Sequence, residues 1–191
     1  MKWAVGGAKL IILYLPHKAT YRECHLSNRI IKPLFMTPKY ISLGEHVYIG
    51  HYARIEGVDQ YNDKHFTPDI RIEDGVSIIQ SLYLTCANRI VIGKNTAIAS
   101  NVTITDINHP YDDVYVSIEK QDIEVSEVII GEDCKIYNNV VILPGVHIGK
   151  HVTIGANSVV SKDIPDYSVA AGTPAKVIKK FDFEKEKWIK V

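Results

Sequence analysis

The sequence predicts an all-β fold, a parallel β-helix solenoid built from hexapeptide repeats, and three observations support this prediction. From Val128 to Pro165 an aliphatic residue returns at every sixth position without interruption. A period of six fits neither an α-helix nor a half-exposed strand and is typical of β-helical solenoids. The position four residues after each aliphatic residue is small or β-branched, and glycines recur where the chain must turn. The repeating residues are Ile130, Ile136, Ile142, Ile148, Ile154 and Val160, and the glycines are Gly131, Gly145, Gly149 and Gly155.

The repeat length indicates how the chain is wound. If each hexapeptide supplies one short flat side and one corner, three of them, about 18 residues, complete a triangular coil. Successive coils then stack as parallel strands about 4.8 Å apart. The aliphatic column points into the prism and becomes its core, so no single repeat is expected to fold alone.

The same period occurs earlier in the chain but is broken at three places. The polar stretch 59–69 contains Pro68 and predicts an excursion from a corner. The repeat then slips by two residues at Arg89–Ile90. The longest break spans 105–127, and because a solenoid has no packing reason to insert such a segment between two good coils, we expect it to be functional. The earlier repeating residues are Leu43, Ile49, Ile55, Ile72, Ile78, Leu84, Ile92, Ile98 and Ile104.

Composition excludes several functional classes. The chain has 191 residues, enough for one domain with a sizeable core. Lys and Arg total 22, as do Asp and Glu, so no overall charge attracts nucleic acid. The three cysteines, Cys24, Cys86 and Cys134, lie in unrelated contexts and predict buried free thiols rather than disulfides or a zinc cluster. This cysteine usage fits a reducing, cytoplasmic location.

The N-terminal segment, residues 1–40, is expected to cap the first coil. The apolar stretch Trp3–Leu15 is too short to cross a bilayer and is not followed by a signal-peptidase site, so no integral membrane segment is expected. Basic residues in the segment outnumber the single acid, Glu23. This bias indicates either a solvated cap face or a surface for peripheral contact with a phosphorylated or lipid-linked acceptor. The basic residues are Lys2, Lys9, Lys18, Arg22, Arg29, Lys32 and Lys39.

Repeat, loop and closing segment together resemble a known family. The chain carries [Leu/Ile/Val]-Gly-x-x-x-x hexapeptides, the tripeptide Asn108-His109-Pro110 at the start of the long loop, and AAGTPAKVIKK from Ala170 to Lys180. In this order they resemble the hexapeptide-repeat acyltransferases, in the branch of acetyl-CoA-dependent sugar and xenobiotic O-acetyltransferases that includes maltose, galactoside and polysaccharide acetyltransferases. The resemblance spans about residues 40–180. It implies a left-handed β-helix, acetyl-CoA as donor, and a homotrimer with sites between subunits.

The resemblance also implies a catalytic base, His109. Acetyl-CoA is already activated, so a histidine that takes the acceptor's proton and later returns it to sulfur suffices, with no metal and no covalent enzyme intermediate. Asp106 is close in sequence and is a candidate to orient the imidazole. Asn108 and Tyr111 flank the histidine and are candidates to contact the acceptor.

A second acceptor position departs from the family pattern. Maltose- and galactoside-type relatives place an acceptor-contacting Asn in the coil before the histidine, and the matching position here is Ile79, followed by Gln80 and Ser81. Gln80 and Ser81 therefore become the candidates, and a simple free sugar as acceptor is in doubt.

The resemblance implies a donor site along later coils. Tyr137 matches the outward aromatic residue that stacks on pantetheine, where many relatives have Trp. Ala156 after Gly155 matches positions that meet the pantetheine, and Ser161 and Lys162 match positions near the phosphates. The closing segment matches the part that binds the adenosine end, and its residues are Gly172, Thr173, Pro174 and Lys176.

Beyond the repeats the sequence predicts a short C-terminal helix. Phe181, Trp188 and Ile189 among Lys and Glu indicate an amphipathic helix that packs on the last coil and blocks end-to-end stacking. The expected segments are a cap over 1–40, a hexapeptide-repeat β-helix over 41–175 with an excursion (59–69) and a catalytic loop (105–127), and a helical tail over 176–191.

The remaining histidines do not form a metal motif. His46, His51, His147 and His151 fall at outward repeat positions with spacing too irregular for a tetrahedral zinc site. A metal-bearing γ-carbonic-anhydrase on the same solenoid is therefore the less favoured enzyme, and no metal is expected for catalysis.

The sequence thus predicts an acetyl-CoA-dependent O-acetyltransferase acting on a sugar hydroxyl, in bacterial lipopolysaccharide or surface-polysaccharide assembly. Two alternatives remain open. One is an N-acetyltransferase acting on an amino-sugar nucleotide, and the other is a non-catalytic β-helix that serves as a binding scaffold.

Overall fold

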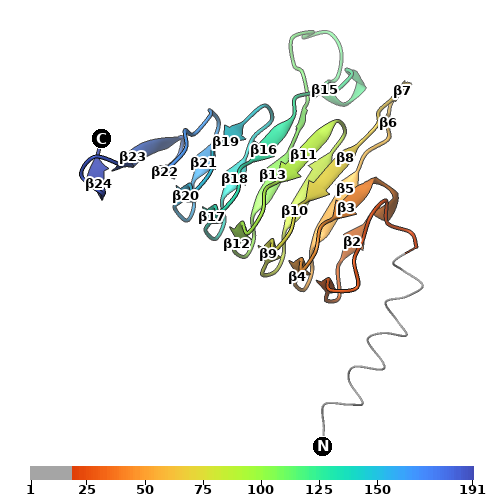
Figure 1. The fold of residues 1–191 in the computed structure, drawn as a ribbon. Coiled ribbons are helices and arrows are strands. Elements are labelled where there is room, and N and C mark those ends of the chain that lie inside the picture. Colours follow the sequence, from red (N-terminus) through yellow and green to blue (C-terminus); the bar gives the residue numbers. More distant parts are fainter. Residues whose placement is uncertain (1–18) are drawn as a thin grey trace, which may run out of the picture.

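The computed structural model describes residues 19–191, which wind into a prism of stacked coils with three flat sides (Figure 1). Each side is a sheet whose solenoid strands pair in parallel, and these sheets contain nine, six and five strands. The prediction of a hexapeptide-repeat parallel β-helix is confirmed. Trp3–Leu15 and the basic residues Lys2, Lys9 and Lys18 lie outside the described residues.

The strands are two to five residues long, except for one in the C-terminal hairpin. The nine-stranded sheet contains β1 (Arg29–Ile30), β4 (Tyr48–Ile49), β9 (Ser77–Ile78), β12 (Ala97–Ile98), β17 (Lys135–Ile136), β20 (Thr153–Ile154), β22 (Ser168–Gly172), β23 (Ala175–Asp182) and β24 (Lys187–Lys190). The six-stranded sheet contains β2 (Phe35–Met36), β5 (Arg54–Gly57), β10 (Tyr83–Cys86), β13 (Thr103–Thr105), β18 (Val141–Ile142) and β21 (Val159–Val160). The five-stranded sheet contains β3 (Ile41–Leu43), β8 (Asp69–Ile72), β11 (Arg89–Ile92), β16 (Val128–Ile130) and β19 (His147–Ile148).

Four further strands form two antiparallel pairs outside the prism. They are β6 (Gln60–Tyr61) with β7 (Lys64–His65), and β14 (Ile107–Asn108) with β15 (Glu124–Val125). Two short 3-10 turns, η1 (Pro38–Tyr40) and η2 (Ile118–Lys120), complete the structure. No α-helix occurs between residues 19 and 191.

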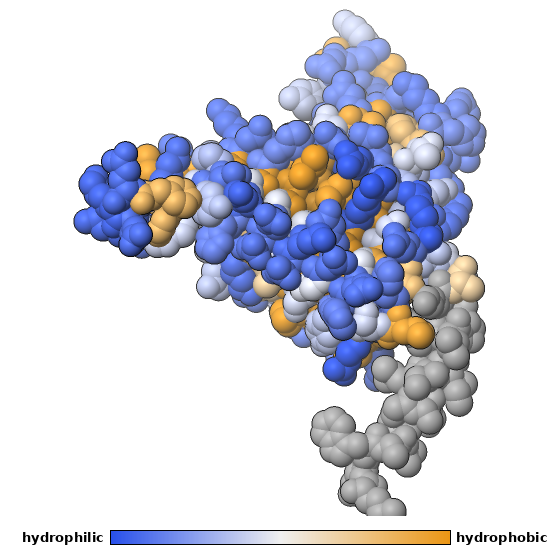
Figure 2. Space-filling view, viewed as in Figure 1, coloured by the Kyte–Doolittle hydropathy of each residue, from blue (hydrophilic) through white to orange (hydrophobic). Residues whose placement is uncertain are grey.

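The aliphatic column forms the core, as the period predicts. Ile130, Ile136 and Ile142 are fully buried, one on each side of a coil. Lys135 pairs with Thr153, and Val141 pairs with Val159, a step of 18 residues in both cases. Coils approach so closely that a Cβ at Gly131 would lie 2.7 Å from the carbonyl carbon of Gly149. In Figure 2 apolar residues also gather on the middle of one face, while hydrophilic residues dominate the projecting C-terminal hairpin.

All three breaks in the repeat fall at one corner of the prism. Ile41 pairs with Ile70, Ile70 with Ile90, and Ile90 with Val128, so successive coils take 29, 20 and 38 residues instead of 18. The extra residues lie each time between the six-stranded and the five-stranded sheet. We call this corner the loop edge. From it rise the β6–β7 hairpin and the long loop that contains β14 and β15 (Figure 1).

The corner between the nine-stranded and six-stranded sheets is regular, and we call it the ladder edge. Every coil turns there in four residues, one of which has a positive φ that asparagine tolerates better than most residues. Asn139 Nδ2 donates to Asn157 Oδ1 at 2.9 Å, and Asn101 Nδ2 donates to Asn139 Oδ1 at 3.3 Å. The positive-φ residues of this edge are Lys32, Tyr52, Ser81, Asn101, Asn139 and Asn157.

The prediction of a C-terminal helix is wrong. After β22 the chain reverses, and β23 and β24 add antiparallel strands to the nine-stranded sheet. The end of a solenoid exposes a row of unpaired backbone N–H and C=O groups, and a hairpin satisfies them where a helix could not. Trp188 pairs across this hairpin with Phe181 and their rings meet edge to face, so this aromatic contact joins two strands rather than lying on one helical face.

At the other end, parallel pairing begins before residue 41. Glu23 bridges to Ser42, and β1 and β2 pair with β4 and β5, so part of the segment expected as a cap is itself a coil. None of the described residues belongs to a helix long and apolar enough to span a membrane.

Candidate active site

His109 lies at the base of the long loop, where the loop leaves the loop edge. The chain exits β13, forms the short antiparallel pair of β14 with β15, and returns to the prism at β16. His109 follows β14 directly and its side chain is exposed. The position fits a base that must reach a substrate outside the prism.

The imidazole contacts a tyrosine from another insertion. Tyr61, in the β6–β7 hairpin, places its Oη 3.5 Å from His109 Nδ1. The two rings meet edge to face, with centroids 5.4 Å apart. The same Oη donates to the Glu119 side chain and lies 3.0 Å from both Glu119 Oε2 and the Glu119 carbonyl oxygen. Desolvation and the neighbouring Glu119 carboxylate raise the pKa of the Tyr61 phenol, so it keeps its proton at neutral pH.

The hairpin and the long loop are tied together at two further points. Lys64 Nζ lies 3.0 Å from Asp122 Oδ2. Asn62 Nδ2 donates to the Gln121 carbonyl at 3.5 Å. Gln121 in turn donates from Nε2 to the carbonyls of Asp113 and Val116, both at 3.0 Å. Two insertions far apart in the sequence therefore form one structure above the loop edge.

Asp106 does not orient His109, contrary to the expectation from their proximity in sequence. It is fully buried, and its carboxylate accepts hydrogen bonds from the backbone N–H groups of Ala87, Asn88 and Arg89 at 2.8, 2.8 and 2.9 Å. These groups belong to the corner with two extra residues in the coil below. Asp106 therefore stabilises an irregular turn.

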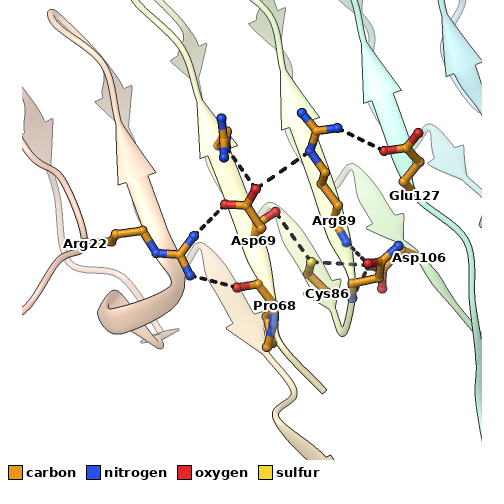
Figure 3. Close-up of polar contacts among 9 residues, drawn as sticks. Arg22, Pro68, Asp69, Cys86, Arg89, Asp106 and Glu127 are labelled. Carbon is orange, nitrogen blue, oxygen red and sulfur yellow. Dashed lines mark hydrogen bonds and ion pairs between the residues drawn. The ribbon is translucent and has the colours of Figure 1, made fainter. Parts of the chain in front are cut away.

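The buried Cys86 thiol also contacts Asp106, with Sγ 3.3 Å from Asp106 Oδ2 (Figure 3). Burial and then the Asp106 carboxylate raise the pKa of the Cys86 thiol, so it is neutral and a poor nucleophile. All three cysteines are buried, and no disulfide joins them.

A chain of ion pairs crosses the coils beside the loop edge (Figure 3). Asp69 Oδ1 lies 2.6 Å from Arg22 Nη1, and its Oδ2 lies 3.7 Å from Arg89 Nε. Arg89 Nη1 lies 3.2 Å from Glu127 Oε2, at the point where the long loop returns. Arg22 also donates to the Pro68 carbonyl at 3.0 Å. Each exposed pair contributes little alone, but together they link the bases of the insertions.

Four other predicted site residues share the loop edge with His109. Asn108 Nδ2 donates to Glu124 Oε2 at 3.4 Å, across the β14–β15 pair. Tyr111 is 71% exposed on the loop. Ser161 and Lys162 follow β21 at this corner, in a later coil, and both are exposed.

Most of the remaining predicted residues lie on the ladder edge instead. Gln80 and Ser81 follow β9, Tyr137 follows β17, and Gly155 and Ala156 follow β20. The closing segment stacks above them, with the Gly155 N–H donating to the Ala170 carbonyl at 2.8 Å. Its turn contains Gly172, Thr173 and Pro174, with a cis peptide bond between the last two, and Lys176 follows in β23.

One chain does not bring the two groups of residues together, because the six-stranded sheet lies between the two edges. The longest strands of this sheet have four residues and span about 13 Å. Tyr137 is 44% exposed, with Lys135 Nζ 5.4 Å from the centre of its ring, so the ladder edge offers an accessible aromatic surface. The predicted site residues of the two edges would come together only if the ladder edge of one chain lay beside the loop edge of another.

Sequence reasoning missed Tyr61 and Glu119. The composition of 59–69 predicts a polar excursion, and nothing in it marks Tyr61. The signal that could have found it is the position of the breaks, because the hairpin and the long loop leave the same corner of the prism only two coils apart. Among residues 19–191 no group of three or more His, Cys, Asp or Glu side chains is arranged to hold a metal ion.

Comparisons with known proteins give consistent results. The family described as bacterial transferase hexapeptide (six repeats) matches residues 127–162. The putative lipopolysaccharide biosynthesis O-acetyl transferase WbbJ of Escherichia coli K12 is 38% identical over 194 residues, covering 97% of this chain and 93% of that protein. The galactoside O-acetyltransferase of the same strain is 33% identical over 170 residues, covering 84% of this chain and 71% of that protein.

Solved structures show the same fold. A maltose O-acetyltransferase from Clostridium difficile 630 superposes with a TM-score of 0.52 at 25% identity, covering 86% of this chain and 72% of that one. AntD, an N-acyltransferase from Bacillus cereus solved with dTDP and 3-hydroxybutyryl-CoA, gives a TM-score of 0.71 at 17% identity, covering 91% and 90%.

Proposed function

The chain belongs to the hexapeptide-repeat acetyltransferases, and from this membership we propose that it transfers the acetyl group of acetyl-CoA to a sugar hydroxyl during lipopolysaccharide or surface-polysaccharide assembly. The observation that carries the proposal is the 38% identity to the putative lipopolysaccharide biosynthesis O-acetyl transferase WbbJ along nearly the whole chain, including the loop that holds an exposed His109. The ester-forming relatives favour a hydroxyl over an amine as acceptor.

In this proposal His109 acts as a general base. Its Nε2 takes the proton of the acceptor hydroxyl as the oxygen attacks the thioester carbonyl and a C–O bond forms. The tetrahedral intermediate then loses its C–S bond, and the imidazolium Nε2 returns the proton to the departing thiolate. The products are an O-acetyl sugar and free CoA thiol, and every atom is accounted for without a metal or a covalent enzyme intermediate.

The donor is proposed to lie between the two edges. Tyr137 would stack on the pantetheine, with Gly155 and Ala156 beside it, while Ser161 and Lys162 meet the phosphates. Lysine suits that role as a mobile point charge for phosphate oxygens. Gly172, Thr173, Pro174 and Lys176 would take the adenosine end.

A homotrimer, which the family resemblance implies, is part of the proposal and would account for the same division of residues. Donor and acceptor candidates on the ladder edge need a neighbouring chain's His109, and three prisms around one axis supply one such pairing per chain. The loop supports this arrangement, since Val114 and Tyr115 near its tip are 82% and 97% exposed. Apolar side chains displayed in this way are typical of a surface that contacts another molecule.

The acceptor sugar can be found by screening. Purified protein, acetyl-CoA and a panel of lipid-linked and free glycans are incubated, and release of CoA thiol is measured together with the mass of each glycan. We expect thiol release only with the correct acceptor, whose mass gains one acetyl group. The product is then treated with mild alkali, which removes an ester but leaves an amide.

Three outcomes would contradict the proposal. An acetyl group that survives mild alkali on an amino sugar would assign N-acetylation. No binding of acetyl-CoA by calorimetry would assign a scaffold. A persistent monomer in light scattering would contradict a site shared between chains.

A further inference from the structure

The β6–β7 hairpin has no role in the coil that carries it. The insertion that contains it adds eleven residues to one corner. The hairpin itself exposes Lys64 and His65, and none of its residues belongs to the hydrophobic core. Its one half-buried aromatic residue, Tyr61, instead contacts His109, 48 positions along the chain. The hairpin therefore delivers a side chain to the proposed catalytic residue.

The hydrogen-bond donors and acceptors around Tyr61 define a direction. A phenol has one hydrogen, and both Glu119 oxygens at 3.0 Å from Tyr61 Oη can only accept it. Once this hydrogen points to Glu119, Tyr61 Oη can take part in further hydrogen bonds only as an acceptor. His109 Nδ1, 3.5 Å from the same oxygen, must then be the nitrogen that carries hydrogen in the neutral imidazole.

We propose that Tyr61 is a positioning residue for His109, which holds the imidazole in the Nδ1–H tautomer and leaves Nε2 free to take the acceptor's proton. The proposal rests on the proposed function of His109. The distance of 3.5 Å is at the long end for a hydrogen bond, and such contacts commonly tighten when the substrate complex forms. The edge-to-face ring contact fixes the plane of the imidazole independently of the hydrogen bond.

The arrangement also has a consequence during the reaction. When Nε2 takes the proton, the imidazolium carries a positive charge, and the Glu119 carboxylate lies one phenol away. Tyr61 then connects the two charged groups through a pair of hydrogen bonds, Nδ1–H to Oη and Oη–H to Oε2. The residue touches neither the sugar nor the donor in this account, so it positions the base and does not itself react.

The decisive variant is Tyr61→Phe, which keeps the ring and removes only the oxygen. We expect kcat to fall about 10-fold to 100-fold, the range for losing a hydrogen bond that supports a charged group, with the KM for acetyl-CoA changed less than about twofold. In protein labelled with ¹⁵N-histidine, the wild-type His109 spectrum should show the Nδ1–H tautomer. In the variant the signal should move toward Nε2–H.

Two variants separate this role from simple bracing of the loop. Lys64→Ala and Asn62→Ala each remove a contact between the hairpin and the loop without touching His109. Both are expected to keep kcat within about threefold of wild type and to keep the wild-type tautomer, because surface contacts contribute little.

Several results would overturn the proposal. They are wild-type kcat in Tyr61→Phe, an unchanged His109 tautomer in that variant, or an equal loss in Lys64→Ala. The tautomer measurement needs no acceptor, so it decides the role of Tyr61 even where transfer is not observed. Full activity of His109→Ala would contradict the proposed function instead, which keeps the two failures distinct.

Discussion

The ladder edge and the loop edge are corners of the same prism, and they are built in opposite ways. At the ladder edge every coil turns in four residues, one of them at positive φ, and asparagine side chains bond from coil to coil. At the loop edge three consecutive coils take 11, 2 and 20 residues more than the regular 18. The ladder edge repeats one type of turn in every coil, whereas the loop edge carries an insertion in each of three consecutive coils.

The difference teaches where a solenoid can tolerate insertions. Each insertion begins and ends at a corner, so the buried aliphatic column on either side keeps its register. The extra chain also needs new hydrogen-bond partners, and the buried Asp106 carboxylate supplies them for the turn at Ala87–Arg89. The ladder edge needs no such device because its turns are all alike. We therefore expect substitution of Asp106 or His109, at the loop edge, to affect stability or kcat, and substitution of Tyr137, at the ladder edge, to affect donor binding.

The largest effect on stability is expected from Asp106→Ala. The change removes the buried carboxylate that accepts hydrogen bonds from the N–H groups of Ala87, Asn88 and Arg89, and we expect the free energy of unfolding to fall by about 3 kcal/mol. Urea denaturation measures it. Asp112→Ala, on the exposed part of the loop, is the control and should change stability by less than about 0.5 kcal/mol. Equal stability of the two variants would contradict the claim that Asp106 stabilises the turn at Ala87–Arg89.

Tyr137→Ala tests the ladder edge. Loss of the aromatic surface should raise the KM for acetyl-CoA about tenfold, which corresponds to about 1.4 kcal/mol and matches the contribution of an aromatic contact. The value of kcat should stay near wild type, since the base is on the other edge. Tyr52→Ala, at the same edge in an earlier coil, is the matched control. A fall in kcat with unchanged KM would contradict the assignment of the donor site.

The smallest effect is expected from Asp59, at the base of the hairpin. Hydrogen bonds from Tyr40 and Lys39 lower the pKa of the Asp59 carboxyl to about 2. Because the pKa is lowered in the folded state, these contacts stabilise the fold at pH values above the ordinary pKa of aspartate, about 4. Their contribution to stability is lost as the pH falls from about 4 to about 2. Asp59→Asn should therefore lower the melting temperature slightly at pH 6 and not at pH 2. A difference that grows on acidification would show the opposite sign.

Much of the fold follows from the sequence because one physical rule, an inward aliphatic residue every six positions, holds between Leu43 and Val160 everywhere except at the three breaks. The rule also locates the three breaks, since a break is a change of register. It does not predict what the inserted chain does. Asp106 is three residues from His109 but points into the turn below, whereas Tyr61 is 48 residues away and touches it. Such a contact depends on how two insertions fold against each other, which no local pattern encodes.

The tail shows a different limit. Its apolar residues suit a helix or a strand, and the local sequence does not decide between them. The open edge of β22 decides, because its unpaired backbone groups accept a strand. Sequence patterns therefore predict repeats well and their ends poorly, since an end is set by what the neighbouring coil leaves unsatisfied.

The central claim is that the chemistry occurs at the loop edge, at His109. The rate of CoA thiol release by His109→Ala, with the acceptor found by screening, tests it most directly. His65→Ala, which removes an exposed histidine of the adjacent hairpin, is the matched control. We expect the first variant to lose activity by about 10²-fold to 10⁴-fold with an unchanged melting temperature, and the second to keep wild-type activity. A His109→Ala protein that is folded and fully active would contradict the account.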